Sequence, residues 1–259
     1  MSASLTNSSL ASSSSERRGI AHVSAAAPFE WLRHGVEDFR QIPLLSLLYG
    51  FLFAGFCAAV YLASSNSPGF TTGFLTGLVV LGPFLAAGLY AASRDLERGE
   101  TPSISGSLRL LIQRRTYLAL FSVLLALVMT AWIRVSALLF ALKFSTLSPS
   151  MEAYTNMLSS GEGWIALSYF FGIGFLLVAA VFVISAVSVP LILDRDTDFI
   201  TAMQKSYRAV TSNPGAMIVW AAIIAALTMI GIATAFVGLV VIFPVLGYAT
   251  WHSYRALVR

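Results

Sequence analysis

The sequence predicts an all-α polytopic membrane protein: a helical bundle of six transmembrane helices with amphipathic helices on the cytoplasmic side. Of its 259 residues, 57% are hydrophobic and only 11% are charged, whereas soluble domains are about 45–50% apolar and about 25% charged. The mean hydropathy is +0.80. Apolar runs recur at the length of about 20 residues that a membrane helix needs. This composition excludes a disordered protein, a coiled coil and nearly every soluble enzyme.

The chain begins with a tail over residues 1–27 that is rich in serine and alanine, with eight serines among the first fifteen residues. Such a stretch buries too little apolar surface to offset its ordering entropy, so we expect disorder there. It lacks the apolar core of a secretory signal. Residues 28–259 are then expected to form a single transmembrane domain.

Four apolar runs precede the last one, and each is long enough to cross a bilayer. They lie at about residues 42–63, 70–92, 117–142 and 164–193. The final run, residues 216–250, would extend about 52 Å as one helix, which is too long for one crossing. We therefore expect two helices, at about 215–233 and 236–254. The turn between them should fall among small residues: Gly231, Ala233, Ala235 and Gly238.

The basic residues support this count. Fourteen of the sixteen lysines and arginines lie before the first span, between spans two and three, between spans four and five, or after span six. Because lysine and arginine gather in cytoplasmic loops, this pattern places both termini in the cytoplasm. A five-span alternative would leave Arg255 and Arg259 on the outside.

Amphipathic segments precede the first, third and fifth spans, and each has an apolar stripe at helical spacing. The stripes are Phe29, Leu32, Val36 and Phe39; Ile104, Leu108, Leu111 and Ile112; and Phe199, Met203, Tyr207 and Val210. We expect these helices to lie at the membrane interface or on the cytoplasmic ends of the bundle. The first and third segments end at prolines, Pro43 and Pro214.

The ends of the hairpins also resemble one another. Arg94 follows Pro83 by eleven residues and Arg255 follows Pro244 by eleven, while Arg195 follows Pro190 by five. The chain therefore reads as three repeated units, each an amphipathic helix plus a hairpin, beginning near residues 28, 94 and 195. Chance similarity between apolar segments is the alternative.

Three stretches carry a family resemblance: Trp31 to Pro43, Gly82-Pro83, and the closing FPVLGYATWHSYRALV from Phe243. With them, the chain from Phe29 to Arg259 resembles bacterial six-span integral membrane proteins of unknown function, some of which are labelled cytochrome c oxidase subunits. The resemblance implies a multi-pass protein of the bacterial inner membrane and a respiratory neighbourhood. It carries over no catalytic residues.

The residues themselves point to no chemistry. A haem–copper catalytic subunit needs several intramembrane histidines, whereas this chain has His22, His34 and His252, which do not form a ligand pair inside a span. We interpret His252 as an interfacial side chain and Cys57 as a packing residue. No nucleotide-binding, protease or hydrolase motif is present. We therefore expect no enzyme activity, no metal, no cofactor and no nucleic-acid partner.

Arg134 is the single charge deep inside a predicted span. A charge at the centre of a membrane helix is costly and often functional. Arg134 lies about 25 Å along the helix from Tyr117, however, so its side chain can extend to the outer head groups. The alternatives are that Arg134 contacts an anion or donates a hydrogen bond within the bundle.

Two functions follow from these observations. The first is a non-enzymatic accessory, scaffold or assembly component of a membrane complex, with other subunits of that complex and the lipid bilayer as its partners. The second is a carrier or facilitator for a small anionic or lipid-like molecule. The sequence leaves open whether the protein forms a homo-oligomer.

Overall fold

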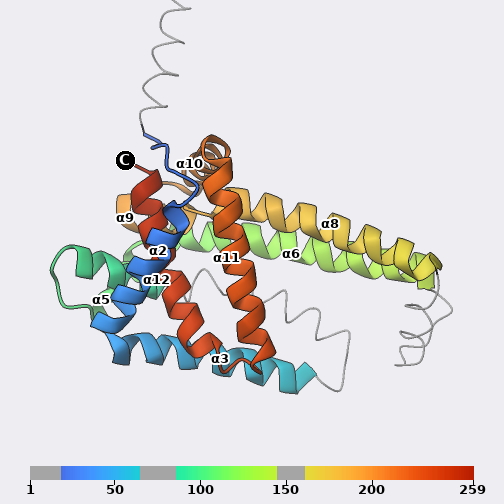
Figure 1. Ribbon diagram of the computed structural model, residues 1–259, viewed down its shortest axis with the longest axis horizontal. Coiled ribbons are helices and arrows are strands. Elements are labelled where there is room, and N and C mark those ends of the chain that lie inside the picture. The colour runs from blue at the N-terminus through green and yellow to red at the C-terminus, as the bar shows by residue number, and fades with distance from the viewer. Residues whose placement is uncertain (1–18, 65–85, 145–160) are drawn as a thin grey trace, which may run out of the picture.

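The structure is a computed structural model that describes residues 19–64, 86–144 and 161–259 (Figure 1). Within these ranges the regular structure is helical, apart from one isolated bridge between Ile20 and Val258. The helices are α2 (Ala27–Gln41), α3 (Pro43–Ser64), a segment over 86–97, α5 (Ile104–Gln113), α6 (Arg115–Phe144), α8 (Gly161–Ser185), α9 (Ser188–Arg195), α10 (Phe199–Ser212), α11 (Pro214–Ala233) and α12 (Leu239–Leu257). The all-helical prediction is thus confirmed for the described part of the chain.

Within the described residues, four helical stretches are long and apolar enough to cross a membrane: residues 43–62, 115–135, 172–195 and 214–233. They correspond to the first, third, fourth and fifth predicted spans. Most of the second predicted span, residues 70–85, lies outside the described residues. The sixth, α12, forms as a helix, and its crossing of the membrane stays a prediction.

Residues 19–27, which the sequence assigns to the disordered tail, are held by the rest of the protein. The N–H of Ala21 donates to the carbonyl of Leu257 at 2.9 Å, and the N–H of Arg259 donates to Gly19 at 3.1 Å. The Asn213 side chain bonds both the carbonyl of Ala21 and the N–H of Val23. Backbone pairing with the C-terminus offsets the entropy cost of ordering residues 19–27, and the part of the predicted tail before residue 19 lies outside the described residues.

Two helix junctions have almost the same backbone. Ile42, between α2 and α3, has φ −129° and ψ 58°, and Asn213, between α10 and α11, has φ −132° and ψ 51°. Each precedes a proline that opens the next helix, and a residue before proline is kept out of the helical region. The junctions after the amphipathic helices α2 and α10 therefore have the same backbone conformation. The junction between α5 and α6, at Arg114, has no proline, and its backbone differs, with φ −98° and ψ 8°.

Helix α12 lies at the centre of the packing, against α2 and α3. A Cβ added to Gly35 of α2 would lie 2.6 Å from the Val245 carbonyl, so this crossing depends on glycine. On α3, Phe53 stacks on Phe243 with ring centroids 3.8 Å apart. Between α3 and α12, the Ser46 hydroxyl is hydrogen-bonded to Tyr248 at 2.8 Å.

The predicted turn between spans five and six is confirmed in position. Helix α11 ends at Ala233 and α12 begins at Leu239, with positive φ at Ala235 and Phe236. The N–H of Gly238 donates to the Thr234 hydroxyl, and every other backbone N–H from Thr234 to Ile242 donates to a carbonyl of the same hairpin. An apolar turn that satisfies its own backbone is suited to a lipid environment.

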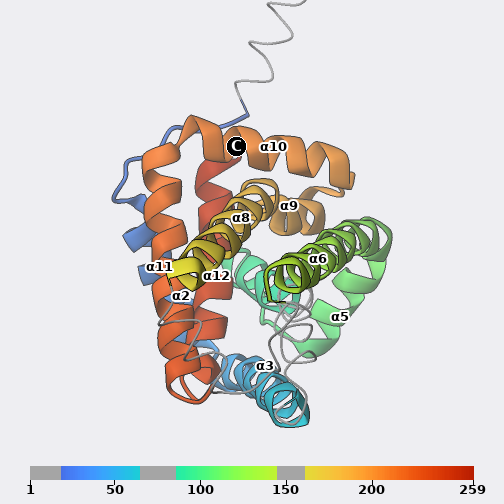
Figure 2. The ribbon, with the colours of Figure 1, turned by 90° about the vertical axis from the view of Figure 1, so that its right-hand side faces the viewer.

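The fourth predicted span is interrupted at Ala186–Val187, between α8 and α9, although residues 172–195 together are long and apolar enough to cross a membrane. The long helices also do not form one parallel bundle. Figures 1 and 2 show α6 and α8 running side by side, while α11 and α12 leave in a different direction. The two hairpins therefore tilt differently relative to any one membrane normal.

The predicted apolar stripes lie beside the most deeply buried positions of the amphipathic helices. In α5, Ile104, Leu108 and Ile112 are about half exposed, and the buried residues are Ser107 and Leu110. In α10 the most buried positions are small residues, which allow close approach of another helix, and the stripe residues Phe199 and Met203 pack beside them. The buried sets are Pro28, Trp31, Gly35 and Asp38 in α2, and Ala202, Ser206 and Ala209 in α10. Phe29 and Tyr207 face outward.

Candidate functional site

The arginines that end the three proposed units meet at one carboxylate, that of Asp194 at the end of α9. The distances from Asp194 oxygens are 3.6 Å to Arg94 Nε, 3.7 Å to Arg255 Nη1 and 4.0 Å to Arg195 Nε. Arg98 adds a fourth guanidinium at 3.8 Å. The Asp194 side chain is only 11% exposed. We call Asp194, these four arginines and Tyr254 the arginine cluster.

Tyr254 fixes the carboxylate at the centre of the arginine cluster, because its hydroxyl donates to Asp194 Oδ2 at 2.7 Å. Arg195 in turn donates to the Tyr254 hydroxyl and to the carbonyls of Val258 and Arg259. The cluster therefore fastens the C-terminal end of α12 to α9.

A second carboxylate, Glu97, joins the same end of the molecule. It accepts from the Trp251 indole N–H at 3.1 Å and from Arg255 Nε at 2.9 Å. The sequence suggests solvated pairing of Glu97 with Arg94 and Arg98 on its own segment. The structure instead pairs Glu97 with α12, because folding brings that helix across the end of segment 86–97.

Asp38 forms a separate polar contact among three helices. It is 6% exposed and accepts a hydrogen bond from the Ser93 hydroxyl. His252 Nε2 lies 2.9 Å from Asp38 Oδ2, and the His34 ring lies 5.1 Å from the His252 ring, centroid to centroid. The sequence points to His252 as an interfacial side chain but gives no sign of Asp38 as its partner, since the two are 214 residues apart.

The loop after α9 positions the arginine cluster. Asp196 adopts the left-handed conformation, with φ 52°, and pairs with Arg114. Asp198 then caps α10: its carboxylate accepts from the Thr201 N–H at 2.9 Å, and this hydrogen bond lowers the pKa of Asp198. Across the cluster, burial raises the pKa of Asp95, an effect that Glu100 reinforces and Arg94 and Arg98 partly offset.

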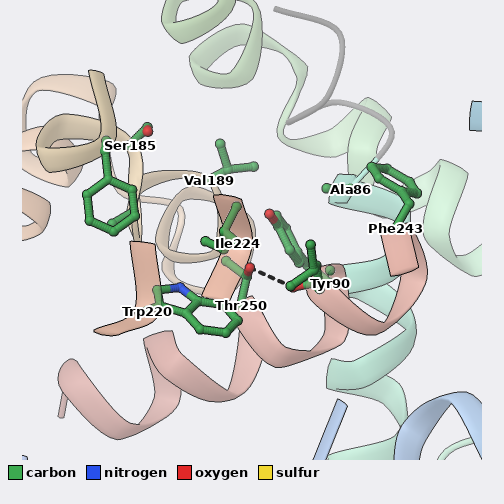
Figure 3. Close-up of a pocket in the computed structure, with 12 residues that line it drawn as sticks. Ala86, Tyr90, Ser185, Val189, Trp220, Ile224, Phe243 and Thr250 are labelled. Carbon is green, nitrogen blue, oxygen red and sulfur yellow. Dashed lines mark hydrogen bonds between the residues drawn. The ribbon is translucent and has the colours of Figure 1, made fainter. Parts of the chain in front are cut away.

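One helical turn away from the arginine cluster lies an apolar cavity of about 220 Å³ (Figure 3). Tyr90, Val189 and Thr250 line it, and they precede Arg94, Asp194 and Tyr254 by four or five residues. The other lining residues are Ala86, Phe182, Ser185, Ala186, Trp220, Ile224, Phe243, Leu246 and Gly247. This composition, apolar walls with a few polar groups, is typical of sites for small apolar ligands.

The residues that the sequence singles out are not brought together. Arg134 is exposed on α6 and is not among the cavity's lining residues. Cys57 is buried against Phe53 and Leu239. Within the described ranges, no group of three or more His, Cys, Asp or Glu side chains could hold a metal ion.

Part of the chain is similar to a known protein family. Residues 70–194 match a family model described as "Predicted integral membrane protein (DUF2189)". The match covers 125 residues, slightly less than half of the chain. No curated protein and no solved structure matches. The matched residues run from the second predicted span to Asp194 of the arginine cluster, and the chain is thus similar to an integral membrane family of unknown function.

Proposed function

We propose that this protein is a non-enzymatic accessory or scaffold component of a membrane complex, with six membrane crossings and both termini in the cytoplasm. The observation that carries the proposal is the exposed apolar surface of the α6–α8 pair. In the membrane-length part of α6 only 17% of the residues are buried by the rest of the chain. Large patches of this kind are covered by lipid or by another apolar protein surface.

The side chains on this surface are large and lie on both helices. Val123 and Leu127 of α6 are 57% and 62% exposed, and Phe175 and Leu176 of α8 are 72% and 68% exposed. Figure 1 shows the pair extending away from the other helices, so both of its long sides are accessible. Asp194 and the four arginines of the arginine cluster, in contrast, pair with one another within the chain.

The hypothesis that the protein carries a small anionic molecule receives less support. An anion carrier of the kind that the sequence suggests would need Arg134 at a binding cavity, but the Arg134 side chain lies on the exposed face of α6. The accessory role needs no such placement, and it agrees with Arg134 as a snorkelling side chain.

Site-specific photocrosslinking in cells tests the proposal. A photoreactive residue at Val123 or Leu127 should form one discrete protein adduct. The same residue at Ile218 of α11, which is 70% exposed, should form none and serves as the matched control. Adducts with lipid only, or the same mixture of proteins at all three positions, would contradict a partner surface on α6.

A further inference from the structure

We propose that the cavity beside the arginine cluster is a binding site for one acyl chain and ester carbonyl of a membrane lipid. This inference goes beyond the accessory role, because it holds whether or not the α6–α8 surface contacts a partner. It concerns the space between segment 86–97, the α8–α9 break, α11 and α12.

The size and walls of the cavity fit an acyl chain. An apolar cavity of about 150 Å³ binds benzene, so about 220 Å³ accommodates a longer hydrocarbon segment. Phe182, Ile224, Phe243 and Leu246 supply apolar wall. An apolar space of this volume favours an apolar occupant, because the lining atoms gain dispersion contacts with it.

Two hydrogen-bond donors at the cavity have no protein partner. In the described part of the chain, neither the Ser185 hydroxyl nor the Trp220 indole N–H makes a hydrogen bond to another residue. Thr250 differs, because its hydroxyl donates to the Leu246 carbonyl at 2.7 Å. Trp220 is 1% exposed and lines the cavity, and a donor at an apolar wall gains from an acceptor beside it. Figure 3 shows both side chains on the cavity wall, where the oxygens of a ligand's ester group would supply acceptors.

The position of the cavity along the helices indicates that this carbonyl belongs to a lipid ester. Two of the segments that line the cavity reach the arginine cluster about one turn later, from Tyr90 to Arg94 and from Thr250 to Tyr254. One turn is about 5.4 Å. The cavity therefore lies just inside the charged end of the protein, where the ester groups of a bilayer lie below the phosphates. Arg94 and Arg98 are near the level of the head group.

The test uses the full chain in vesicles of phosphatidylethanolamine and phosphatidylglycerol that contain a phosphatidylethanolamine with a photoreactive acyl chain. Labelled peptides are mapped by mass spectrometry. Adducts should concentrate in residues 182–189 and 243–250. Ser185→Phe should remove them by filling the cavity, whereas Ala180→Phe, on the exposed face of the same helix, should not.

Two smaller changes keep the test independent of folding. Ser185→Ala and Trp220→Phe preserve most of the packing and remove one donor each, so each should lower cavity labelling by about three- to tenfold. Unchanged labelling in both would overturn the role of the ester carbonyl. Equal cavity labelling by a photoreactive alkane without a carbonyl would overturn it as well. Adducts spread evenly over all exposed helices, unaffected by Ser185→Phe, would overturn the site itself.

Discussion

Replacing Asp194 with asparagine should destabilise the protein strongly, whereas the same replacement at Asp196 should have little effect. Asp194 is 11% exposed and has four guanidinium groups within 4.0 Å, while Asp196 is 57% exposed and pairs with Arg114 alone. Asparagine keeps an acceptor for the Tyr254 hydroxyl and tolerates the left-handed backbone of Asp196. The two variants therefore differ mainly in charge.

The magnitude follows from the burial of the partners. Removing one side of a buried ion pair costs about 3–5 kcal/mol. The four guanidinium groups are between 17% and 47% exposed, so solvent screening reduces the expected loss for Asp194→Asn to about 2–3 kcal/mol. An exposed pair contributes about 0–1 kcal/mol, which is the expected loss for Asp196→Asn.

The assay is equilibrium or thermal unfolding of the purified protein in one mild detergent, with both variants measured beside the unmodified chain. A difference of about 2 kcal/mol corresponds to about a thirtyfold change in the folded-to-unfolded ratio. Equal losses in the two variants would refute the reasoning that Asp194 is the shared counter-ion of three chain segments.

Further predictions concern packing, the amphipathic helices, Arg134 and pH. Gly50→Ala should destabilise the protein by about 1–3 kcal/mol, because the added Cβ would overlap the Val240 carbonyl of α12. Gly55 faces open space, so Gly55→Ala should be neutral or slightly stabilising. Unfolding in detergent measures both variants. Phe199→Asp and Met203→Asp should lower stability because both side chains pack on the core, while exposed Gln204→Asp should be silent, and equal tolerance at all three would refute the packing of α10. Arg134→Lys and Arg134→Gln should both accumulate in the membrane and complement a deletion strain, and loss of complementation at normal abundance would restore the anion-contact hypothesis. The lowered pKa of Asp198 means that its stabilisation is complete above the ordinary aspartate pKa of about 3.9 and is lost as pH falls through the lower folded value; Asp198→Asn should remove this acid dependence from unfolding curves.

Local features of the fold were predictable because local sequence determines them. The first span, expected at 42–63, is α3 (Pro43–Ser64), since a proline sets its start and an uncharged run sets its length. The turn after Ala233 follows from the excess length of the last apolar run. The proline junctions at Ile42 and Asn213 follow from the restriction of the residue before proline.

Features that depend on tertiary packing were not predictable in the same way. The stripe Phe199, Met203, Tyr207 and Val210 is amphipathic, but close approach through Ala202, Ser206 and Ala209 decides which side is buried. The helix is interrupted at Ala186–Val187, although the apolar sequence is continuous there. In the candidate site, the spacing from proline matches for Arg94 and Arg255 but not for Arg195. Their shared partner Asp194 becomes visible only when α9, α12 and segment 86–97 are brought together.

The sidedness of the α11–α12 hairpin tests the proposed membrane arrangement most directly. In a Cys57→Ala background, single cysteines are introduced as Ala235→Cys in the turn and Arg259→Cys at the C-terminus, and intact cells are treated with a membrane-impermeant maleimide. The account predicts labelling of Ala235→Cys in intact cells and of Arg259→Cys only after the membrane is permeabilised. Labelling of both positions from the same side would contradict a hairpin that crosses the membrane twice.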